Sequence, residues 1–467
     1  MYPVSETYLR STLAYCDRCG NTELARIMAC NDGVFMDRMC PVHGVERVRI
    51  AKSPDWYLKR TSQPRLAHEI KDRLPSSKGC PNDCGPCQWH TGGIHLPVFS
   101  ITNDCNLNCP ICFTYNRPDL KYYKSIEGTK KIIGHIVERS GGVQLINLTG
   151  GEPTLHPDLF AILNACKHEG IGRITMNTNG IRIAEDESFA EEIKKAGVQV
   201  VLSLDTFDPE KSRVIHGKDI TGLKKTCLER LEALDIPTTI LSVCIKGVNE
   251  SDVADIVHTY LRKPFVRSIT IQNMTFTGKN GSRFLPHEHI TMDEVEALVS
   301  LKEGIELNDF FPLSSYHPLC YSAAYYMVRD EQLISLTRIL DKDLLTKLSE
   351  NSYYLNPDRD FSVEFRDGIN RLWASGTDEK TIAVLKQFLA DMYPKDLRLS
   401  QSERNKMQEK WVKMLLIHPH MDKYNFDIDR VSSCGDLVPD ETGRMIPACA
   451  YNLLYRHKDP RFWESTD

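Results

Sequence analysis

The stretch DCNLNCPICF, residues 104–113, follows the apolar run LPVFSIT, residues 96–102, and places Cys105, Cys109 and Cys112 in one short loop. Thiolates are soft ligands that select zinc or iron–sulfur clusters. A closed structural site uses four ligands, so three thiols leave one coordination position free for a cofactor or substrate. The spacing alone leaves two alternatives open: a [4Fe–4S] cluster with one open iron, or a zinc site with a distant fourth ligand.

Five further apolar runs follow the first and alternate with helical patterns. They span residues 143–149, 173–178, 199–205, 238–245 and 268–274, with amphipathic stretches such as TKKIIGHIVERS and HPDLFAILNACKHEG between them. Apolar strands that alternate with helices of this length predict a parallel sheet with right-handed crossover connections. We therefore expect an α/β fold, and six strands favour a partial (β/α)6 barrel over a small doubly wound sheet.

Glycines and polar residues follow the second, third and fourth predicted strands, in the stretches TGGEP, MNTNG and LSLDT. In α/β folds, ligands bind at the carboxyl ends of the strands. A carboxylate beside paired glycines suits an ammonium group, and the other polar groups suit ribose hydroxyls and a carboxylate. Each stretch alone is typical of a turn or a helix cap, but their shared position indicates a binding site. The candidate residues are Gly150, Gly151, Glu152, Pro153, Asn177, Asn179, Ser203 and Asp205.

The combination of CNLNCPIC with TGGEP resembles the radical S-adenosylmethionine (SAM) superfamily over roughly residues 96–280. The resemblance implies a [4Fe–4S] cluster on Cys105, Cys109 and Cys112 whose fourth iron binds the amino and carboxylate groups of SAM. It also implies that the Gly150–Pro153 loop contacts the methionine ammonium and that Ile111 lies near the adenine, where many members carry an aromatic residue. One-electron cleavage of SAM would then give a 5′-deoxyadenosyl radical, with a low-potential donor such as ferredoxin or flavodoxin supplying the electron.

The N-terminal region contains two cysteine motifs, CDRC and CPVHG. Three thiolates and an imidazole, from Cys16, Cys19, Cys40 and His43, are typical of a tetrahedral zinc site or a rubredoxin-like mononuclear iron site. Cys30 lies between the motifs and competes as a ligand, although its surroundings favour a packed thiol. Because residues 1–60 show little apolar periodicity, we expect metal ligation to supply most of their order.

A second cysteine-rich segment, GCPNDCGPCQWH, directly precedes the barrel region. It contains Cys80, Cys84, Cys87 and His90 and repeats the cysteine spacing of residues 105–112, which predicts an auxiliary cluster. Three further candidate ligands are Cys320, Cys434 and Cys449, which would complete that cluster or build a second one. By contrast, Cys166, Cys227 and Cys244 fall within apolar helical or strand patterns and are predicted to be buried free thiols.

Nearly the whole chain resembles the tetraether lipid synthase family, formerly described as pterin methyltransferases. The shared features are the CxxC and CPxHG motifs, the CPxDCGxC segment and the C-terminal stretch GRMIPACAYN. The resemblance implies radical coupling of two sp3 carbons at lipid chain ends. One departure concerns a further cysteine that members often carry where this chain reads HTGGIHLPVFSIT, so the ligands of one auxiliary cluster stay open.

Two classes of function follow from these features. The first is a radical SAM enzyme that couples lipid chains or methylates or otherwise modifies a small molecule such as a pterin. The second is an inactive metal-binding interaction protein, which the intact cysteine loop disfavours. The stretches LCYSAAYYMV and WVKMLLI can line a lipid cavity or form ordinary core, and no sequence feature separates a lipid substrate from a pterin.

Length and composition set the domain organisation and the cellular context that we expect. The chain has 467 residues, a net charge of −5, 26% charged residues and 16 cysteines. We expect a cytoplasmic protein with at most peripheral membrane contact, because we find no signal sequence and no apolar run of ~18–20 residues. The absence of a basic block disfavours a nucleic-acid partner, and cysteines in the reducing cytosol favour metal ligation over disulfides.

The predicted domains are a metal-knuckle domain (1–60), an auxiliary-cluster segment (61–95), the barrel (96–285) and a mostly helical C-terminal region carrying auxiliary-cluster ligands (286–467).

Overall fold

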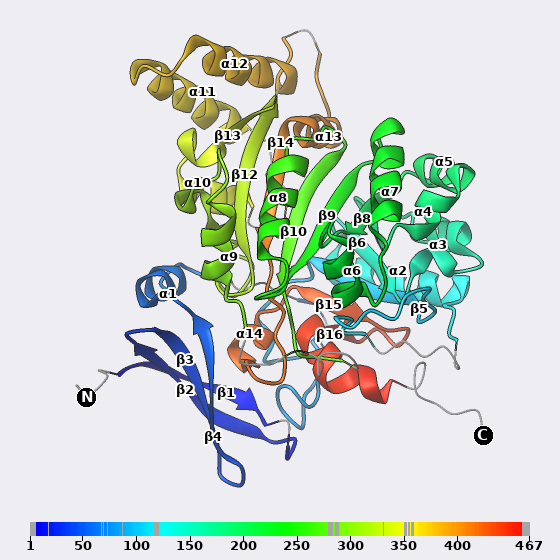
Figure 1. The fold of residues 1–467 in the computed structure, drawn as a ribbon, viewed down its shortest axis with the longest axis vertical. Coiled ribbons are helices and arrows are strands. Elements are labelled where there is room, and N and C mark those ends of the chain that lie inside the picture. The colour runs from blue at the N-terminus through cyan, green and yellow to red at the C-terminus, as the bar shows by residue number, and fades with distance from the viewer. Residues whose placement is uncertain are drawn as a thin grey trace.

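The computed structural model describes residues 6–459 except 17, 67, 69, 72, 86, 115–120, 279–283, 285–288, 330, 350–352, 354, 356–358 and 396. Figure 1 shows a small sheet near the N-terminus and a much larger sheet that is flanked by helices. Over the described residues, the large sheet has 12 strands.

The N-terminal region forms an antiparallel sheet of β1 (Thr7–Tyr15), β2 (Thr22–Cys30), β3 (Gly33–Cys40) and β4 (Gly44–Ala51). Ala25, Ile27, Val34 and Met36 are buried on one face, where Tyr57 of α1 (Pro54–Thr61) joins them. Our expectation of little periodic structure here is wrong. Along β2 the buried Ala25 and Ile27 lie on either side of the exposed Arg26, and this period of two is a strand pattern.

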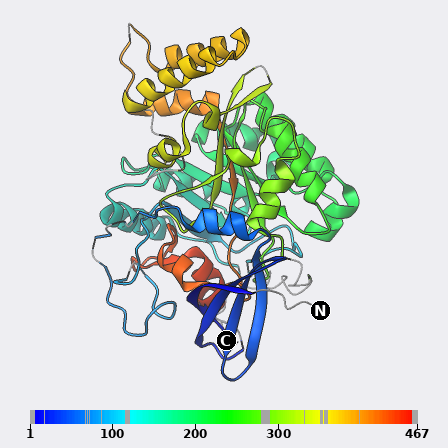
Figure 2. The same ribbon diagram turned by 90° about the vertical axis from the view of Figure 1, so that its left-hand side faces the viewer.

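The N-terminal sheet lies against the C-terminal part of the chain, as Figure 2 shows. Asp427 precedes α14 (Ile428–Ser432) and accepts hydrogen bonds from Arg10 Nη2 at 2.8 Å and Thr12 Oγ1 at 2.5 Å, both on β1. These contacts join the two ends of the chain.

Six parallel strands form the centre of the large sheet, in the order of the sequence. They are β5 (Leu96–Thr102), β6 (Ile146–Gly150), β7 (Ile174–Thr178), β8 (Gln199–Ser203), β9 (Thr238–Cys244) and β10 (Val266–Asn273). Each pairs in parallel with the next. The six predicted strands and their parallel arrangement are confirmed.

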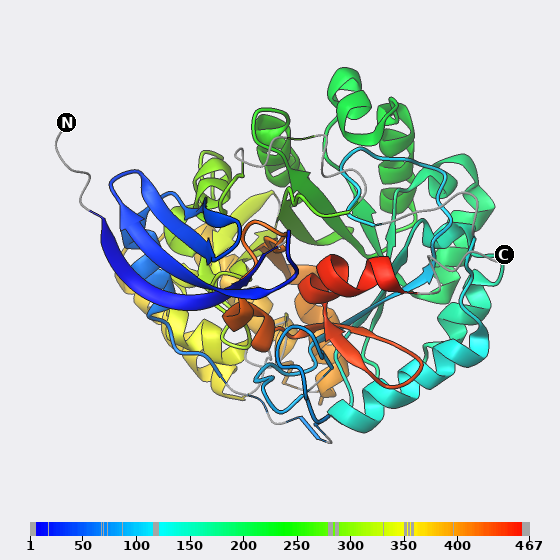
Figure 3. The same cartoon turned by 90° about the horizontal axis from the view of Figure 1, so that it is seen from below.

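Helices connect these strands and pack on one side of the sheet. They are α2 (Ile126–Ser140), α3 (Leu159–Ala165), α4 (Ile181–Glu185), α5 (Glu187–Ala196), α6 (Pro209–His216), α7 (Thr221–Ala233) and α8 (Glu250–Tyr260). Successive side chains of a strand point to opposite faces. Residues such as Leu148 and Leu202 therefore join the core with the helices, whereas Asn147 and Val201 line a cavity on the other face. Seen from below, the helices form an outer ring around the strands (Figure 3).

The region after residue 286 contains more strands than we predicted. It contributes β11 (Phe311–Pro312), β12 (Ser322–Arg329), β13 (Gln332–Ser335), β14 (Val412–Ile417), β15 (Asp436–Pro439) and β16 (Met445–Pro447). The stretch VKMLLI, which we read as helical, is β14 and pairs in parallel with β10. All of its side chains are buried, and a fully buried run carries no period that separates a strand from a helix.

Helices of the same region lie around these strands. They are α9 (Met292–Val299), α10 (Lys342–Leu348), α11 (Arg359–Ala374), α12 (Glu379–Met392), α13 (Gln401–Trp411) and α15 (Ala448–Ala450). Short 3-10 turns span Pro153–Leu155, Leu307–Asp309, Leu336–Arg338 and Arg456–Lys458, and a π-helical turn spans Tyr451–Tyr455. Among the helices of the described residues, none is long and apolar enough to cross a membrane.

A buried carboxylate bridges the two ends of the curved sheet. Asp436 on β15, which pairs with β5, accepts hydrogen bonds from Tyr321 at 2.6 Å, Tyr353 at 2.7 Å and Tyr316 at 2.9 Å. Tyr321 directly precedes β12, which pairs with β14 at the other end of the sheet. In the strand order of the sheet, β12 and β15 lie near opposite ends and are not neighbours. Side-chain hydrogen bonds to Asp436 therefore connect two parts of the sheet that backbone pairing does not join.

Candidate active site and metal centres

The loop after β5 gathers the three predicted cysteines, Cys105, Cys109 and Cys112. All three are partly exposed. Burial raises the pKa of Cys105 to about 12 and also raises the pKa of Cys109, and the neighbouring thiols act in the same direction. Cys105 and Cys109 therefore need a nearby cation in order to become thiolates. The donor set therefore fits a cationic metal cluster.

The paired glycines after β6 let two backbones approach each other. Gly150 has φ +149°, and a Cβ there would lie 2.0 Å from the carbonyl oxygen of Thr102. A Cβ on Gly151 would lie 2.2 Å from the carbonyl oxygen of Asp104. Only glycine fits both positions, because the end of β6 packs directly against the start of the cysteine loop. We predicted close approach to a ligand; the approach seen here is to the cysteine loop.

Glu152 connects the ends of β6 and β7. Its Oε1 accepts hydrogen bonds from the Thr154 backbone N–H at 3.0 Å and from the Thr178 hydroxyl at 2.8 Å, and its Oε2 accepts one from the Asn179 backbone N–H at 2.7 Å. The residue is 1% exposed and caps the 3-10 turn that begins at Pro153. Its carboxylate therefore holds two strand ends in place.

Lys224 on α7 is a buried cation beneath these loops that our sequence reasoning missed. Its Nζ donates to the carbonyl oxygens of Asn179 at 2.6 Å and Ser203 at 2.5 Å, which ties the ends of β7 and β8 together. Burial lowers its pKa, whereas Asp205 and nearby acidic groups act in the opposite direction. A signal was present in the sequence, because Lys224 lies three and four positions before Cys227 and Leu228 on the buried face of α7.

The remaining predicted residues divide between the loop, the cavity and the interior. Asn179 Nδ2 donates to Asn106 Oδ1 in the cysteine loop at 2.7 Å. Asp205 accepts from the Val243 backbone N–H at 2.7 Å, and burial raises its pKa to about 6. Ile111 packs beside a small apolar cluster that includes Ile215. Asn177 lines the cavity inside the sheet.

This cavity lies on the concave side of the sheet and has a volume of about 160 Å³. Phe113 and Thr114, which follow Cys112, line it together with Tyr321 and Tyr353. Each strand from β5 to β10 contributes at least one hydrogen-bonding side chain: Ser100, Asn147, Thr149, Thr175, Asn177, Gln199, Thr239, Ser268, Thr270 and Gln272. Within the described part of the chain, the buried Oδ1 atoms of Asn147 and Asn177 have no hydrogen-bond partner. The cavity therefore offers unused acceptors.

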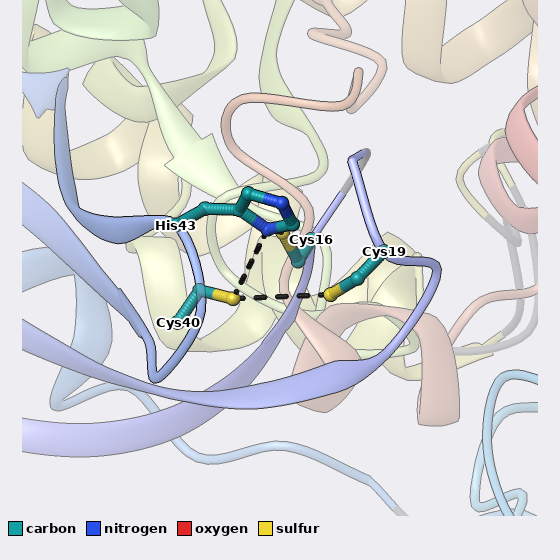
Figure 4. A group of neighbouring side chains, drawn as sticks. All are labelled: Cys16, Cys19, Cys40 and His43. Atoms are coloured by element: carbon teal, nitrogen blue, oxygen red, sulfur yellow. Dashed lines mark hydrogen bonds between the residues drawn. The ribbon is translucent and has the colours of Figure 1, made fainter.

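The N-terminal sheet brings Cys16, Cys19, Cys40 and His43 together at the tips of its hairpins. Their ligand atoms all lie within 4.8 Å of one another. Cys40 Sγ lies 3.8 Å from Cys19 Sγ and 3.4 Å from His43 Nδ1. Figure 4 marks both contacts with dashed lines. Although burial alone raises the pKa of Cys16, backbone N–H groups of Cys19 and Arg18 lower it to about 6. The four side chains form a closed tetrahedral donor set, whereas the Cys30 thiol contacts Glu6 instead.

The structure brings Cys320, Cys434 and Cys449 together around one small cavity, which His418, His420 and Arg430 also line. Burial raises the pKa of each of these three thiols. Cys80 and Cys84 contact each other, Cys87 lies near Cys80, and Cys84 and Cys449 belong to one buried cluster. Two groups of three thiols therefore lie in the same part of the molecule. His90 is buried nearby, and burial lowers its pKa to about 4. A hydrogen bond with the backbone of Cys434 acts in the opposite direction.

Cys166, Cys227 and Cys244 lie apart from these groups. Each has no exposed surface and packs in the main core with the parallel strands and the helices that connect them. Burial raises the pKa of Cys166 to about 12. They are packed thiols, as their sequence surroundings predict.

Comparison with known proteins agrees with this site. Residues 99–260 match the model of the radical SAM superfamily. A probable GTP 3′,8-cyclase of Methanococcus aeolicus is 32% identical over 223 residues, which cover 46% of this chain and 69% of that protein. This chain belongs to the radical SAM superfamily. The superfamily implies a [4Fe–4S] cluster and SAM, and the soft three-thiol loop after β5 fits that cluster.

Similarity over nearly the full length is found with a further relative. A protein of Methanocaldococcus jannaschii named 7,8-dihydro-6-hydroxymethylpterin dimethyltransferase is 26% identical over 483 residues, covering 96% of this chain and 94% of that protein. Its name matches the former description of the family that the sequence resembles. Among solved structures, SuiB of Streptococcus suis bound to SAM covers 45% of this chain and 47% of its own, with 20% identity and a TM-score of 0.37.

Proposed function

We propose that this radical SAM enzyme modifies a carbon of a small nitrogen heterocycle, such as a pterin or a purine, held in the cavity inside the sheet. When bound, the cluster and SAM supply a 5′-deoxyadenosyl radical that abstracts a hydrogen atom. The observation that supports a heterocycle is the cavity wall, because every strand from β5 to β10 contributes a hydrogen-bonding side chain. The electron would come from a low-potential donor such as ferredoxin or flavodoxin.

The unpaired acceptors in the cavity favour a ligand with N–H groups. Asn147 and Asn177 each have a buried Oδ1 that lacks a partner among the residues described. Other polar residues of the cavity wall bond one another: Thr239 accepts from Gln199 Nε2 at 2.7 Å and shares a hydrogen bond with Ser268 at 2.7 Å. A ring with N–H donors would satisfy the two asparagines, whereas an alkyl chain would leave them unpaired at a cost of about 1–3 kcal/mol each. The names of the relatives refer to a pterin and to GTP, and both molecules contain such a ring.

Radical coupling of lipid chains is the second candidate, and it remains a prediction. One observation favours it, because Leu96, Val98, Leu145, Met414 and Leu416 add apolar surface to the same cavity. These residues come from β5, β14 and the chain just before β6. An alkyl chain could lie along them if the polar groups opposite were hydrated. An inactive interaction protein has less support, since the loop of three cysteines is intact.

Anaerobic incubation with candidate substrates tests the proposal. Reconstituted protein is incubated with SAM, dithionite and either 7,8-dihydro-6-hydroxymethylpterin, GTP or a phospholipid extract, and products are identified by mass spectrometry. We expect a heterocycle to increase 5′-deoxyadenosine formation and to yield a modified ring. The variant Asn177→Leu should lose that increase, while Asn164→Leu, on the exposed face of α3, should keep it. A coupled lipid with no change in either heterocycle would overturn the proposal in favour of lipid synthesis.

We further propose that the other two thiol groups hold auxiliary iron–sulfur clusters. Cys320, Cys434 and Cys449 supply three soft donors to one cavity, and Cys80, Cys84 and Cys87 supply three more close by. A cubane places its ligands farther apart than a single ion does, so separate thiols around one cavity suit a cluster. The number of irons per chain in anaerobically reconstituted protein distinguishes one auxiliary cluster from two.

The N-terminal donor set should bind one zinc or iron ion whose loss affects only the hairpin tips. Structural metal sites contribute on the order of 10 kcal/mol in peptides that have no core. This sheet has a core of its own, so we expect Cys16→Ala to remove the metal and expose the turns to protease while the strands stay folded. Metal analysis and limited proteolysis measure both effects. Cys30→Ala, in the same sheet, is the matched control and should keep its metal; loss of metal in both variants, or in neither, would contradict the assignment.

A further inference from the structure

A buried arginine contacts one of the thiols around the small cavity of Cys320, Cys434 and Cys449. Arg430 lies on α14 and is 7% exposed. Its Nε donates to Cys320 Sγ at 3.5 Å, and its Nη2 donates to the Pro419 carbonyl oxygen at 2.8 Å. A guanidinium stays protonated in proteins and can only donate, so the direction of the bond to sulfur is fixed. A permanent positive charge therefore lies against a predicted cluster ligand.

Among the residues that the structure describes, this charge has no carboxylate partner. Asp436 lines the same cavity, but its carboxylate already accepts hydrogen bonds from three tyrosines. Asp427 and Asp429, which precede Arg430 on the chain, pair with other arginines. A buried charge is costly unless it is paired. The negative charge that balances Arg430 is therefore best supplied by the sulfur that it contacts.

The surrounding fold holds the guanidinium beside this sulfur. Asp427 caps α14 by accepting from the Asp429 N–H at 3.0 Å, and it also accepts from Arg10 on β1 at 2.8 Å. The start of the helix is thereby fixed to the N-terminal sheet. The Nη2 bond to Pro419 fixes the far end of the side chain. Turning Arg430 away from the cavity would break that bond, so its charge stays beside the thiols.

We infer that Arg430 is the counter-charge of the auxiliary cluster that Cys320 binds, and that it makes this cluster easier to reduce. A cysteine binds metal as a thiolate, which supplies the negative charge that Arg430 lacks. Reduction adds a further negative charge at a site away from water, and a fixed cation that donates to the sulfur lowers that cost. The inference rests on the proposed auxiliary clusters and adds a residue that raises the potential of one of them.

The alternative is a purely structural role, in which Arg430 only ties α14 to the Pro419 carbonyl oxygen. That role uses Nη2 alone, and it explains neither the Nε bond to sulfur nor the missing carboxylate. Arg60 shows how a structural arginine is arranged in the same region. It is 5% exposed, bonds one carbonyl oxygen on each side of Cys320 in the chain, and pairs with Glu296 at 3.1 Å. Arg430 differs because a thiol stands where Arg60 has its carboxylate.

Three substitutions separate the charge from the hydrogen bond. Arg430→Met removes both, Arg430→Gln keeps an N–H at the position of Nε without the charge, and Arg430→Lys keeps the charge. Arg60→Lys is the control for a disturbed backbone, because it changes the bonds beside Cys320 and still leaves a cation for Glu296.

A redox titration of these variants tests the inference. Each full-length protein is reconstituted anaerobically, its iron is counted, and midpoint potentials are measured from the reduced-cluster signals in electron paramagnetic resonance spectra. The cluster in question gives the signal that Cys320→Ala protein lacks and that does not change on addition of SAM.

We expect this cluster in Arg430→Met to be at least tenfold harder to reduce at a fixed donor potential, which corresponds to a midpoint about 59 mV lower for a one-electron couple. Arg430→Gln and Arg430→Lys should show smaller falls, and Arg60→Lys should stay close to the unmodified protein. If Arg430→Met assembles no cluster, Arg430→Gln takes its place.

Two results overturn the inference alone. One is an unchanged midpoint in a variant that lacks the charge, and the other is an equal fall in Arg430→Met and Arg60→Lys, which would indicate a loosened backbone. If Cys320→Ala protein keeps its full iron content and every signal, the proposed cluster on Cys320 is refuted and the inference fails with it. The iron content of Cys320→Ala therefore distinguishes failure of the inference from failure of the proposed cluster.

Discussion

Replacing Cys105, Cys109 and Cys112 together by alanine is expected to abolish formation of 5′-deoxyadenosine from SAM. The loop after β5 supplies all three soft donors that the structure places there, and alanine cannot ligate iron. Because a superfamily member depends on its cluster for the electron that cleaves SAM, loss of the ligands should bring product below detection. The measurement is chromatography of 5′-deoxyadenosine after anaerobic incubation with SAM and dithionite. Iron per chain should fall by about four relative to the unmodified protein.

The control removes the same number of thiols from the hydrophobic core. Cys166, Cys227 and Cys244 are buried in the main hydrophobic core and are not part of the loop, so their joint replacement by alanine should lower stability while SAM cleavage continues. The iron that remains in the loop variant belongs to the other thiol groups. Retained cleavage in the loop variant would refute the assignment of the cluster, and an unmodified protein with only about four irons would refute the auxiliary clusters.

The central fold could be predicted from the sequence because its signals are local. Each of the six apolar runs from LPVFSIT onward overlaps one strand, and the connecting helices carry their own periodicity and caps. Ser125, for example, caps α2 by accepting from the Gly128 N–H, and Gly141 ends it in a left-handed conformation. The cysteine loop is also local, since its ligands lie within eight residues of one another in DCNLNCPIC.

The C-terminal region could not be predicted in the same way because its strands are defined by partners far away in the chain. The strand β14 pairs with β10 and β12, which are each more than 80 residues distant. A buried run such as VKMLLI offers no period, so the helical pattern just before it misled the assignment. The N-terminal sheet was missed for a different reason. Its core consists of small residues such as Ala14, Ala25 and Ala29, which give a weak apolar pattern.

In the candidate site, motif residues could be located, but the contacts that they make could not. From the sequence we expect Gly151 and Glu152 to approach a ligand. In the structure, Gly151 packs against the backbone after β5, and Glu152 bonds the backbone after β7. His216 and Lys224 lie beside Cys109 and Ser203 without any nearby motif. Their role depends on which helix face meets which strand end, and that is set by tertiary packing.

The second large effect is expected at Asp436, whose replacement by alanine should loosen the contact between the two ends of the curved sheet. The carboxylate accepts hydrogen bonds from Tyr316, Tyr321 and Tyr353, all of which are buried. Alanine leaves three hydroxyls without that acceptor, each at a cost of about 1–3 kcal/mol. The tyrosines recover part of this, because the hydroxyls of Tyr353 and Tyr321 lie 3.1 Å apart and can bond each other once the carboxylate is gone. We therefore expect a net loss of about 4 kcal/mol in the free energy that keeps this part of the sheet closed.

Amide hydrogen exchange measures this loss where it occurs. A loss of about 4 kcal/mol corresponds to roughly thousand-fold faster exchange if exchange follows local opening. It should be confined to β15 and to the segment from Tyr321 into β12, while β7 and β8 exchange as before, since neither strand contacts the carboxylate. Asp378→Ala is the matched control, because Asp378 caps the exposed start of α12 and its loss should cost only about 1 kcal/mol. Tyr353→Phe removes one of the three donors and should give an intermediate effect. The prediction is wrong if the amides of β15 exchange no faster in Asp436→Ala than in Asp378→Ala. In that case the carboxylate does not hold the two ends of the sheet together, and the pairing of β15 with β5 alone keeps β15 in place.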